Sequence, residues 1–341
     1  MYQRLHWAIA ALLVLSFIVG VPVAYAADEL NIYSYRQSFL TKPFIERFEK
    51  ETGTKVNIVF MKKGMLQRLK AEGANSPADV IMTVDIARLH ALAEADLLQP
   101  VESAVLEQNV PAQYRGKDGL WFGLTTRARV VYASRDRVAP DEVRDYEDLA
   151  DAKWRGRICT RSGYHTYQLG LLSSIVLHKG EAAAEQWLRG VKANLARKPQ
   201  GNDRAQVKAI SEGVCDVSLG NSYYYGKMIA NPDQKAWADA VRIVFPNQNN
   251  RGTHVNVSGA AVTKASRNRA NAVAFLEFLS SEAAQQLYAQ QNFEYPVKKG
   301  IPWDPVVEAW GRFEPDTENL YDVAALNGVA VKIVDRVGYD E

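Results

Sequence analysis

The sequence predicts an α/β fold made of two lobes with a ligand cleft between them. Three observations predict this fold. Strand-like and helix-like segments alternate in the first part of the chain, which is typical of βαβ units on a parallel sheet. A second alternation begins near Arg157. Between the two lies a long extended segment, Leu120–Tyr132, which we expect to cross from one lobe to the other.

The first alternation predicts three strands and three helices. Its strand-like segments are short and rich in β-branched residues, whereas its helix-like segments place apolar residues three and four positions apart. Gly53 marks the end of the first helix. The predicted strands are 30–35, 56–60 and 78–83, and the predicted helices are 39–52, 65–72 and 86–95.

The rest of the chain repeats this pattern. Further strands are predicted at 157–160, 214–220, 241–245 and 255–262. Further helices are predicted at 167–178, 182–193 and 270–278, and one more helix runs through Tyr288. We expect one lobe to comprise residues 27–126 and 250–302, and the other 127–249 and 303–341. Two α/β lobes joined by extended crossings are expected to bind a ligand between them, beyond the strand ends.

Charge and motif content argue against several classes of protein. The formal net charge is only +2, with both signs mixed along the chain, which argues against binding to nucleic acid or to a membrane surface. No nucleophile elbow, phosphate loop or paired-carboxylate motif is present, so we do not expect an enzyme. We also expect the chain to be a monomer.

The N-terminus predicts a cleaved signal peptide over residues 1–26. Arg4 precedes an apolar run from Ala8 to Val19, and Ala24 and Ala26 occupy the two positions that a signal peptidase reads. An uncleaved membrane anchor is the alternative, but the apolar run is short for a membrane span. The mature chain is therefore expected to be exported.

The chain has two cysteines, Cys159 and Cys215, each in a strand-like segment. In an oxidising compartment they can form a disulfide if the two strands are neighbours. Two unpaired buried thiols are the alternative, and the sequence leaves both open.

Three consecutive tyrosines, Tyr223 to Tyr225, follow the predicted strand 214–220. Adjacent side chains of a strand point to opposite faces, so two of these rings can converge only if the chain leaves the strand at Asn221-Ser222. Phenolates are hard oxygen donors, and with little His or Cys nearby they point away from zinc or copper. An aromatic core or a stacking shelf is the alternative.

Five motifs, in order, resemble those of the ferric-ion-binding proteins of bacterial iron ABC importers. These are periplasmic solute-binding proteins of type II, with two extended crossovers between lobes. The motifs begin at Asn31 (NIYSYR), Asp79 (DVIMTVD), Trp121 (WFGLTTRAR), Asn221 (NSYY) and Gly252 (GTHVNVSG). The resemblance runs from about residue 31 to about residue 300. It implies a periplasmic protein that captures Fe(III) and delivers it to an inner-membrane ABC permease.

The resemblance also implies a set of metal ligands. The adjacent tyrosine pair that binds iron in this family falls on Tyr223 and Tyr224, and a third tyrosine falls on Tyr167, with Tyr164 as the less favoured choice. Many members add a His-Tyr pair from the first lobe, but this chain has Gln37 and Ser38 there. That departure resembles a subgroup in which three tyrosines hold Fe(III) and an exogenous anion, typically carbonate, completes the coordination.

An anion site follows from the same resemblance. The anion-binding arginine of the family matches Arg127, and Arg36 and Gln37 are candidate helpers across the cleft. A structural salt bridge is the alternative role for Arg127, and ordinary loop hydrogen bonding for the other two. A different function also stays open: an organic cation or an oxyanion held by an aromatic cage and Arg127.

Overall fold

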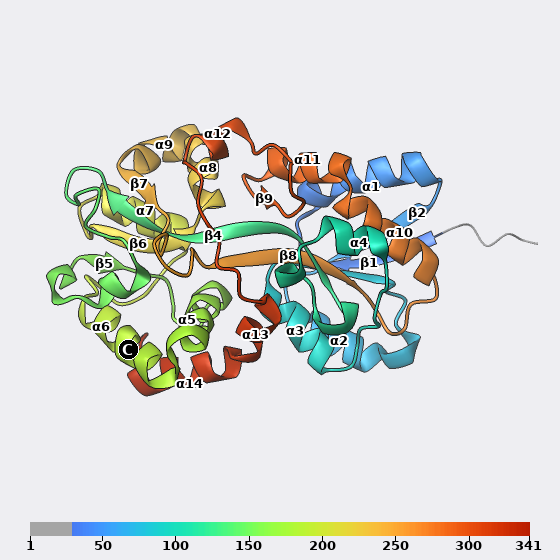
Figure 1. Cartoon of the computed structure of the whole chain (residues 1–341), viewed down its shortest axis with the longest axis horizontal. Helices are drawn as coiled ribbons and strands as arrows, with labels where there is room; N and C mark the ends of the chain where they lie inside the picture. Colours follow the sequence, from blue (N-terminus) through green and yellow to red (C-terminus); the bar gives the residue numbers. More distant parts are fainter. Residues whose placement is uncertain (1–28) are drawn as a thin grey trace, which may run out of the picture.

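One long strand, β4 (Phe122–Ser134), runs through both halves of the molecule (Figure 1). The structure, a computed structural model, describes residues 29–341, so the predicted signal peptide lies outside the described residues. The first half of β4 pairs with β8 (Val255–Val262), and its second half pairs with β6 (Val217–Asn221) and β7 (Val241–Val244), all antiparallel. Every residue of β4 and β8 is buried. The predicted two-lobed α/β architecture with extended crossings is confirmed.

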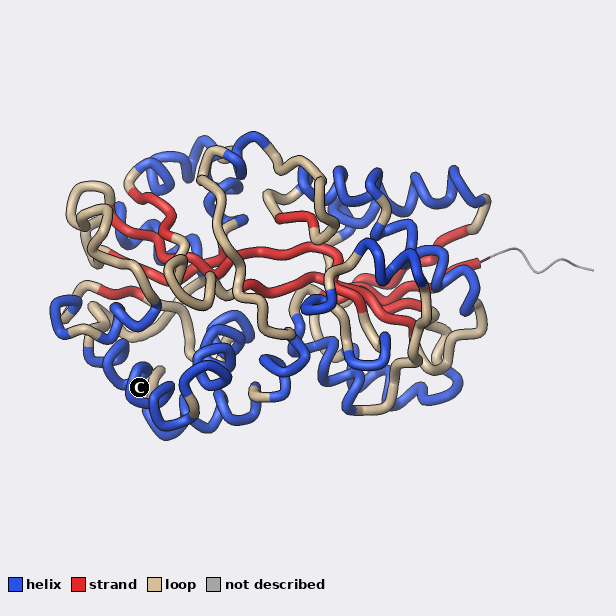
Figure 2. The backbone as a smooth tube through the Cα atoms, in the orientation of Figure 1, coloured by secondary structure: helices blue, strands red, loops and turns tan. Residues whose placement is uncertain are grey.

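The first lobe is built on a sheet in which three parallel strands lie beside the crossing pair. The strand order is β2-β1-β3-β8-β4, and β9 also pairs with β4. Helices lie on both faces of the strands (Figure 2). The elements are β1 (Glu29–Ser34), α1 (Ser38–Thr52), β2 (Lys55–Phe60), α2 (Met65–Glu72), β3 (Val80–Thr83), α3 (Ile86–Glu94), α4 (Ala104–Asn109), α10 (Arg269–Ser280), α11 (Glu282–Gln291) and β9 (Tyr295–Pro296).

The second lobe continues the sheet in the order β4-β6-β5, with β7 also paired to β4. Its elements are β5 (Ile158–Cys159), α5 (Thr166–Lys179), α6 (Glu181–Ala193), α7 (Asp203–Ser211), α8 (Tyr223–Ile229) and α9 (Pro232–Asp239). The C-terminal segment adds α12 (Pro305–Glu308), α13 (Leu320–Ala325) and α14 (Asn327–Val337). Short 3₁₀ turns lie at Gly73–Asn75, Ala112–Tyr114, Lys117–Gly119, Tyr146–Ala150 and Ala152–Trp154. The residue boundaries of the two lobes stay a prediction.

Each predicted strand and helix is present, with ends shifted by a few residues. Helices α4, α7, α8, α9, α12, α13 and α14 and the short strand β9 were not predicted. Aromatic residues favour strands, so the tyrosine-rich α8 gives a weak helical signal on its own. Within residues 29–341, no helix combines the length and the apolar character that crossing a membrane requires.

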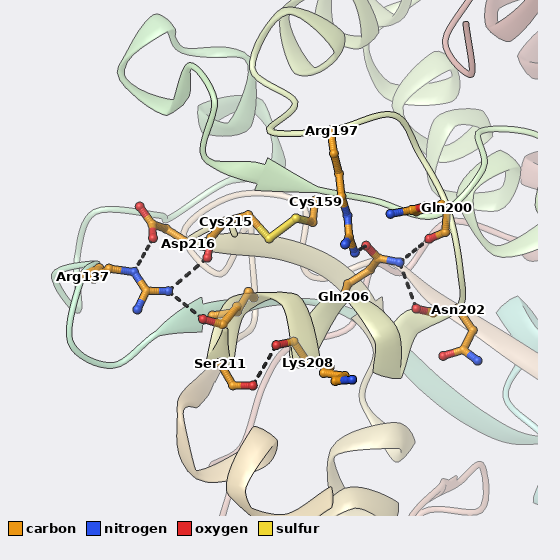
Figure 3. Close-up of a disulfide and its surroundings, with 11 residues drawn as sticks. Arg137, Cys159, Arg197, Gln200, Asn202, Gln206, Lys208, Ser211, Cys215 and Asp216 are labelled. Carbon is orange, nitrogen blue, oxygen red and sulfur yellow. Dashed lines mark hydrogen bonds and ion pairs between the residues drawn. A yellow bond between two sulfur atoms is a disulfide. The ribbon is translucent and has the colours of Figure 1, made fainter. Parts of the chain in front are cut away.

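Cys159 and Cys215 form a disulfide between the ends of neighbouring strands (Figure 3). Cys159 lies in β5 and Cys215 precedes β6, and these strands pair in parallel, with Cys159 opposite Ser218. Both cysteines are buried. In the structure, the alternative of two unpaired thiols does not hold.

A buried ion pair joins Arg36, just after β1, to Glu294, just before β9. The guanidinium Nη2 lies 3.0 Å from Oε2 of Glu294. Thr125 on β4 donates to the same oxygen at 2.7 Å, and Asn292 donates to the other oxygen at 2.9 Å. Burial alone would raise the pKa of Glu294, but the charges of Arg36 and Arg127 and the hydrogen bonds outweigh it and hold the pKa below its usual value. The pair ties the end of β1 to the crossing strand.

Replacing both cysteines by serine is expected to lower the free energy of unfolding by about 4 kcal/mol, because the disulfide restricts the unfolded chain. The cross-linked residues are 56 positions apart. Urea unfolding at pH 7, followed by far-UV circular dichroism, measures the change. Wild type unfolded in dithiothreitol should match the double variant, and an unchanged midpoint in the variant would contradict the expectation.

Glu294→Gln is expected to lower the free energy of unfolding by about 3–5 kcal/mol at pH 7, because it leaves the Arg36 guanidinium buried without its counter-charge. The control is the double variant Arg36→Met, Glu294→Gln, which removes both charges and should recover part of the loss. Urea unfolding of the metal-free proteins provides the comparison.

The Glu294→Gln variant also tests how the stability of the protein depends on pH. The folded-state pKa of Glu294 is lowered, so its stabilising contribution is present above the unfolded-state pKa, about 4.3, and is lost as the pH falls through the lower folded-state value. The stability difference between wild type and Glu294→Gln should therefore narrow below about pH 4. A difference that stays constant down to the acid transition would rule this out.

Candidate metal and anion site

A cavity of about 420 Å³ lies in the cleft between the lobes. All six residues predicted for metal and anion binding line it: Arg36, Gln37, Arg127, Tyr167, Tyr223 and Tyr224. The first two follow β1, at the carboxyl edge of the parallel strands, where ligands bind in open α/β sheets. The tyrosines come from the second lobe. The structure thus brings together side chains that are far apart in the sequence.

Tyr223 and Tyr224 converge because the chain leaves β6 just before them, as the sequence requires. β6 ends at Asn221, and α8 begins at Tyr223. Successive residues of a helix are about 100° apart rather than opposite, and the two ring centroids lie 4.2 Å apart. The strand end is held by Tyr132, whose hydroxyl donates to the carbonyl of Asn221 at 2.7 Å.

Tyr225 does not line the cavity and is a packed ring. It is buried, its ring contacts that of Trp310 with centroids 5.6 Å apart, and its hydroxyl donates to the carbonyl of Val241 at 3.4 Å. Arg135 donates to the same hydroxyl at 3.3 Å. The three consecutive tyrosines therefore divide into two that face the cavity and one that serves the core.

Tyr167, and not Tyr164, is the third tyrosine at the cavity. It lies in the first turn of α5, where the imidazole of His165 caps the helix by accepting from the Tyr167 backbone N–H at 3.2 Å. Burial and the charge of Arg161 lower the pKa of His165 to about 3, which keeps this acceptor neutral. Tyr164 is 47% exposed and donates to the carboxylate of Asp335 on α14. Its hydroxyl is therefore directed elsewhere.

The adjacent phenols of Tyr223 and Tyr224 are hard to ionise in the metal-free protein. Burial, and then the neighbouring phenols of Tyr167 and Tyr224, raise the pKa of Tyr223 well above its ordinary value. Burial, Tyr167 and the carboxylate of Asp203 raise that of Tyr224. A strong positive charge inside the cavity would oppose this effect by stabilising the phenolates.

Arg127 reaches the cavity from β4 and is buried. Its Nη1 donates to Ser258 at 3.1 Å, and its Nη2 donates to the carbonyl of Val84. Its guanidinium carbon lies 5.6 Å from the ring centre of Tyr167. Within residues 29–341 no carboxylate forms a salt bridge with it, so the alternative of a structural ion pair is not seen. The charge of Arg127 is available to the cavity.

The two candidate helpers differ from each other. Arg36 is already engaged by Glu294, although its buried Nε has no hydrogen-bond partner among the described residues. Gln37 is exposed and precedes α1 without capping it through its side chain. Arg36 is thus partly committed to Glu294, whereas the side chain of Gln37 forms no hydrogen bond within residues 29–341.

Lys227 and Arg204 also line the cavity, and the sequence reasoning missed both. The ammonium of Lys227 lies 5.4 Å from the ring centre of Tyr223, and burial lowers its pKa. The guanidinium carbon of Arg204 lies 5.7 Å from the ring centre of Tyr224. Arg204 could have been found from the capping signal at Asn202, which starts α7. Lys227 follows Tyr223 by four positions, so it shares a helix face with it once α8 is recognised.

Known proteins support this description of the fold and the cleft. The family model described as bacterial extracellular solute-binding protein matches residues 33–286. The iron uptake protein A1 of Synechocystis is 46% identical over 315 residues, covering 92% of this chain and 88% of the relative.

Solved structures agree with this match. The ferric iron-binding protein A of Mannheimia haemolytica, in an open conformation, is 52% identical with a TM-score of 0.89, covering 92% of this chain and all of that one. The Trichodesmium protein IdiA (FutA), in complex with iron and citrate, is 43% identical with a TM-score of 0.89, covering 91% of this chain and 99% of that one. The fold, the cleft and these similarities together show that the chain belongs to the family of bacterial extracellular solute-binding proteins.

Proposed function

We propose that this protein binds Fe(III) in the periplasm and delivers it to an inner-membrane ABC permease. The observation that carries the proposal is the meeting of three tyrosines, Tyr167, Tyr223 and Tyr224, at one cavity between the lobes. Relatives at 43–52% identity are described as ferric-binding or were solved with iron. They act in solute binding, and we propose the same role here rather than catalysis.

The donor set suits the cargo. Phenolates are hard anionic ligands, and three of them balance the charge of a ferric ion. Within the described residues, no group of three or more His, Cys, Asp or Glu side chains is arranged to hold a metal. The tyrosines are therefore the candidate ligands. Each must lose its proton as the ion binds.

A bound anion is the second part of the proposal. With three phenolates balancing Fe(III), the cavity keeps the charges of Arg127, Arg204 and Lys227, and none of these has a salt bridge within residues 29–341. An anion such as carbonate would meet Arg127 and Ser258, with Gln37 reaching from the first lobe. Arg36 has one outer nitrogen, Nη2, bonded to Glu294, so it would assist through its other guanidinium nitrogens. The Trichodesmium protein was solved in complex with iron and citrate, which supports the proposal that an anion accompanies the metal.

Delivery follows from the two-lobed form. The protein acts as a monomer whose lobes close on the cargo. A permease can distinguish the loaded protein from the empty one by that change of shape.

Tyr223→Phe is expected to abolish most of the visible phenolate-to-iron absorption band. It should also weaken ferric binding by at least about a hundredfold, because loss of a group that only orients a ligand already costs up to about that much. Wild type supplied with ferric citrate and bicarbonate should show the band. Absorption spectra and competition with a chelator measure both effects.

The matched control for this variant is Tyr225→Phe. Tyr225 is the adjacent ring but packs against Trp310, away from the cavity. The Tyr225→Phe variant should keep the visible band and the ferric affinity of wild type. Undiminished affinity in Tyr223→Phe would remove that residue from the site, and a wild type without any band would favour an organic solute instead.

Arg127→Gln is expected to weaken ferric binding about tenfold or more in bicarbonate, because it removes a charge-assisted contact to the anion. In wild type, affinity should rise with bicarbonate concentration, and in the variant this dependence should largely disappear. Arg127→Lys keeps the positive charge and should retain part of the bicarbonate dependence. Equal bicarbonate dependence in wild type and Arg127→Gln would contradict an anion site at Arg127.

A further inference from the structure

A second buried carboxylate lies behind the tyrosines. Asp203 is the first residue of α7 and has no exposed surface. Its Oδ1 accepts from Nη1 of Arg161 at 3.0 Å, and its Oδ2 accepts from Nη1 of Arg129 at 2.8 Å. The backbone N–H of Asn221 also donates to Oδ2, at 2.9 Å. Both oxygens thus accept hydrogen bonds, from partners in three different segments.

Each partner of Asp203 belongs to, or contacts, a segment that carries a cavity tyrosine. Asn221 is the last residue of β6, two positions before Tyr223. The guanidinium carbon of Arg161 lies 5.5 Å from the ring centre of Tyr167. The carboxylate of Asp203 therefore bonds two groups near the tyrosines. One is the end of β6, which leads to the tyrosine pair, and the other is Arg161, which lies over Tyr167.

Arg129 completes the connection. Besides Asp203, it donates to the side chain of Asn221 at 3.2 Å and to that of Gln168 at 3.1 Å. Gln168 is the residue next to Tyr167 in α5. A guanidinium can hold these acceptors together because its donors are fixed in one plane, whereas an ammonium presents a single point of charge.

The helix that carries Asp203 is itself anchored. The side chain of Asn202 caps it by accepting from the Ala205 N–H at 3.1 Å. Gln206 donates to the carbonyls of Gln200 and Asn202, at 2.5 and 3.0 Å, and accepts from Arg197 at 3.2 Å (Figure 3). These contacts hold the loop before α7 against its first turns, so Asp203 has little freedom to move.

We propose that Asp203 is a positioning residue that sets the placement of Tyr167 relative to the Tyr223–Tyr224 pair, acting through Arg129. The inference rests on the proposed function, since it concerns the geometry of those three phenols as ferric ligands. Groups that orient ligands without touching the metal commonly change metal affinity 10- to 100-fold when removed.

The test compares Asp203→Asn with Asp216→Asn in the full mature protein. Asp216 is a matched control: it is also held by two arginines, Arg137 and Arg157, but it lies just before β6, at the end of the strand away from the cavity. We expect Asp203→Asn to bind Fe(III) about 10- to 100-fold more weakly and to shift its phenolate-to-iron band in wavelength. Asp216→Asn should keep the wild-type affinity and band.

A second variant keeps the test decisive if Asp203→Asn fails to fold. Gln168→Met removes only the contact between Arg129 and the Tyr167 segment, and leaves the buried ion pair intact. It should lower the affinity about tenfold, the lower end of the range for a group that orients a ligand, and shift the band.

The outcomes are distinct. A wild-type band together with unchanged affinity and spectrum in folded Asp203→Asn, or in Gln168→Met, would overturn the inference and leave the proposed function standing. Equal weakening in Asp216→Asn would also overturn it, because the effect would then be one of general stability. Absence of any band in wild type would defeat the proposed function itself.

Discussion

The burial of two arginines on β4 is the constraint on which the rest of the cleft depends. Arg127 and Arg129 are two positions apart on one strand, so their side chains leave the same face, and each is 2% exposed. Arg129 forms an ion pair with Asp203, which also pairs with Arg161. Arg127 bonds a hydroxyl and a backbone carbonyl instead. The same strand therefore supplies one charge that holds the second lobe together and one that faces the cavity.

Local signals predicted much of this protein, and contacts between distant residues account for what they missed. Hydrophobic periodicity identified most strands and helices, and the break at Asn221-Ser222 explained how two tyrosines converge. The interior ion pairs carried no such signal, because Arg36 and Glu294 are 258 positions apart. Arg204 and Lys227 were missed for a different reason: their placement depends on α7 and α8, two helices that were not predicted.

The buried charge networks near the cavity stay within one lobe each, by the predicted lobe boundaries. Arg36 and Glu294 join the end of β1 to β9. Arg129 and Asp203 join β4 to α7. Each side of the cleft is thus stiffened separately. Other contacts do join the two lobes away from the cavity, such as the hydrogen bond from Tyr321 on α13 to Glu94 on α3. A bound ion and its anion would add to the attraction between two preformed surfaces.

The disulfide has a consequence for how the cavity tyrosines are placed. The loop that it closes contains Tyr167 and Asp203, and the tyrosine pair begins eight positions after it. The bond connects β5 to the residue region just before β6, and these two strands lead to Tyr167 and to the tyrosine pair. It therefore fixes, by a covalent bond, the separation of two segments whose tyrosines meet at one cavity.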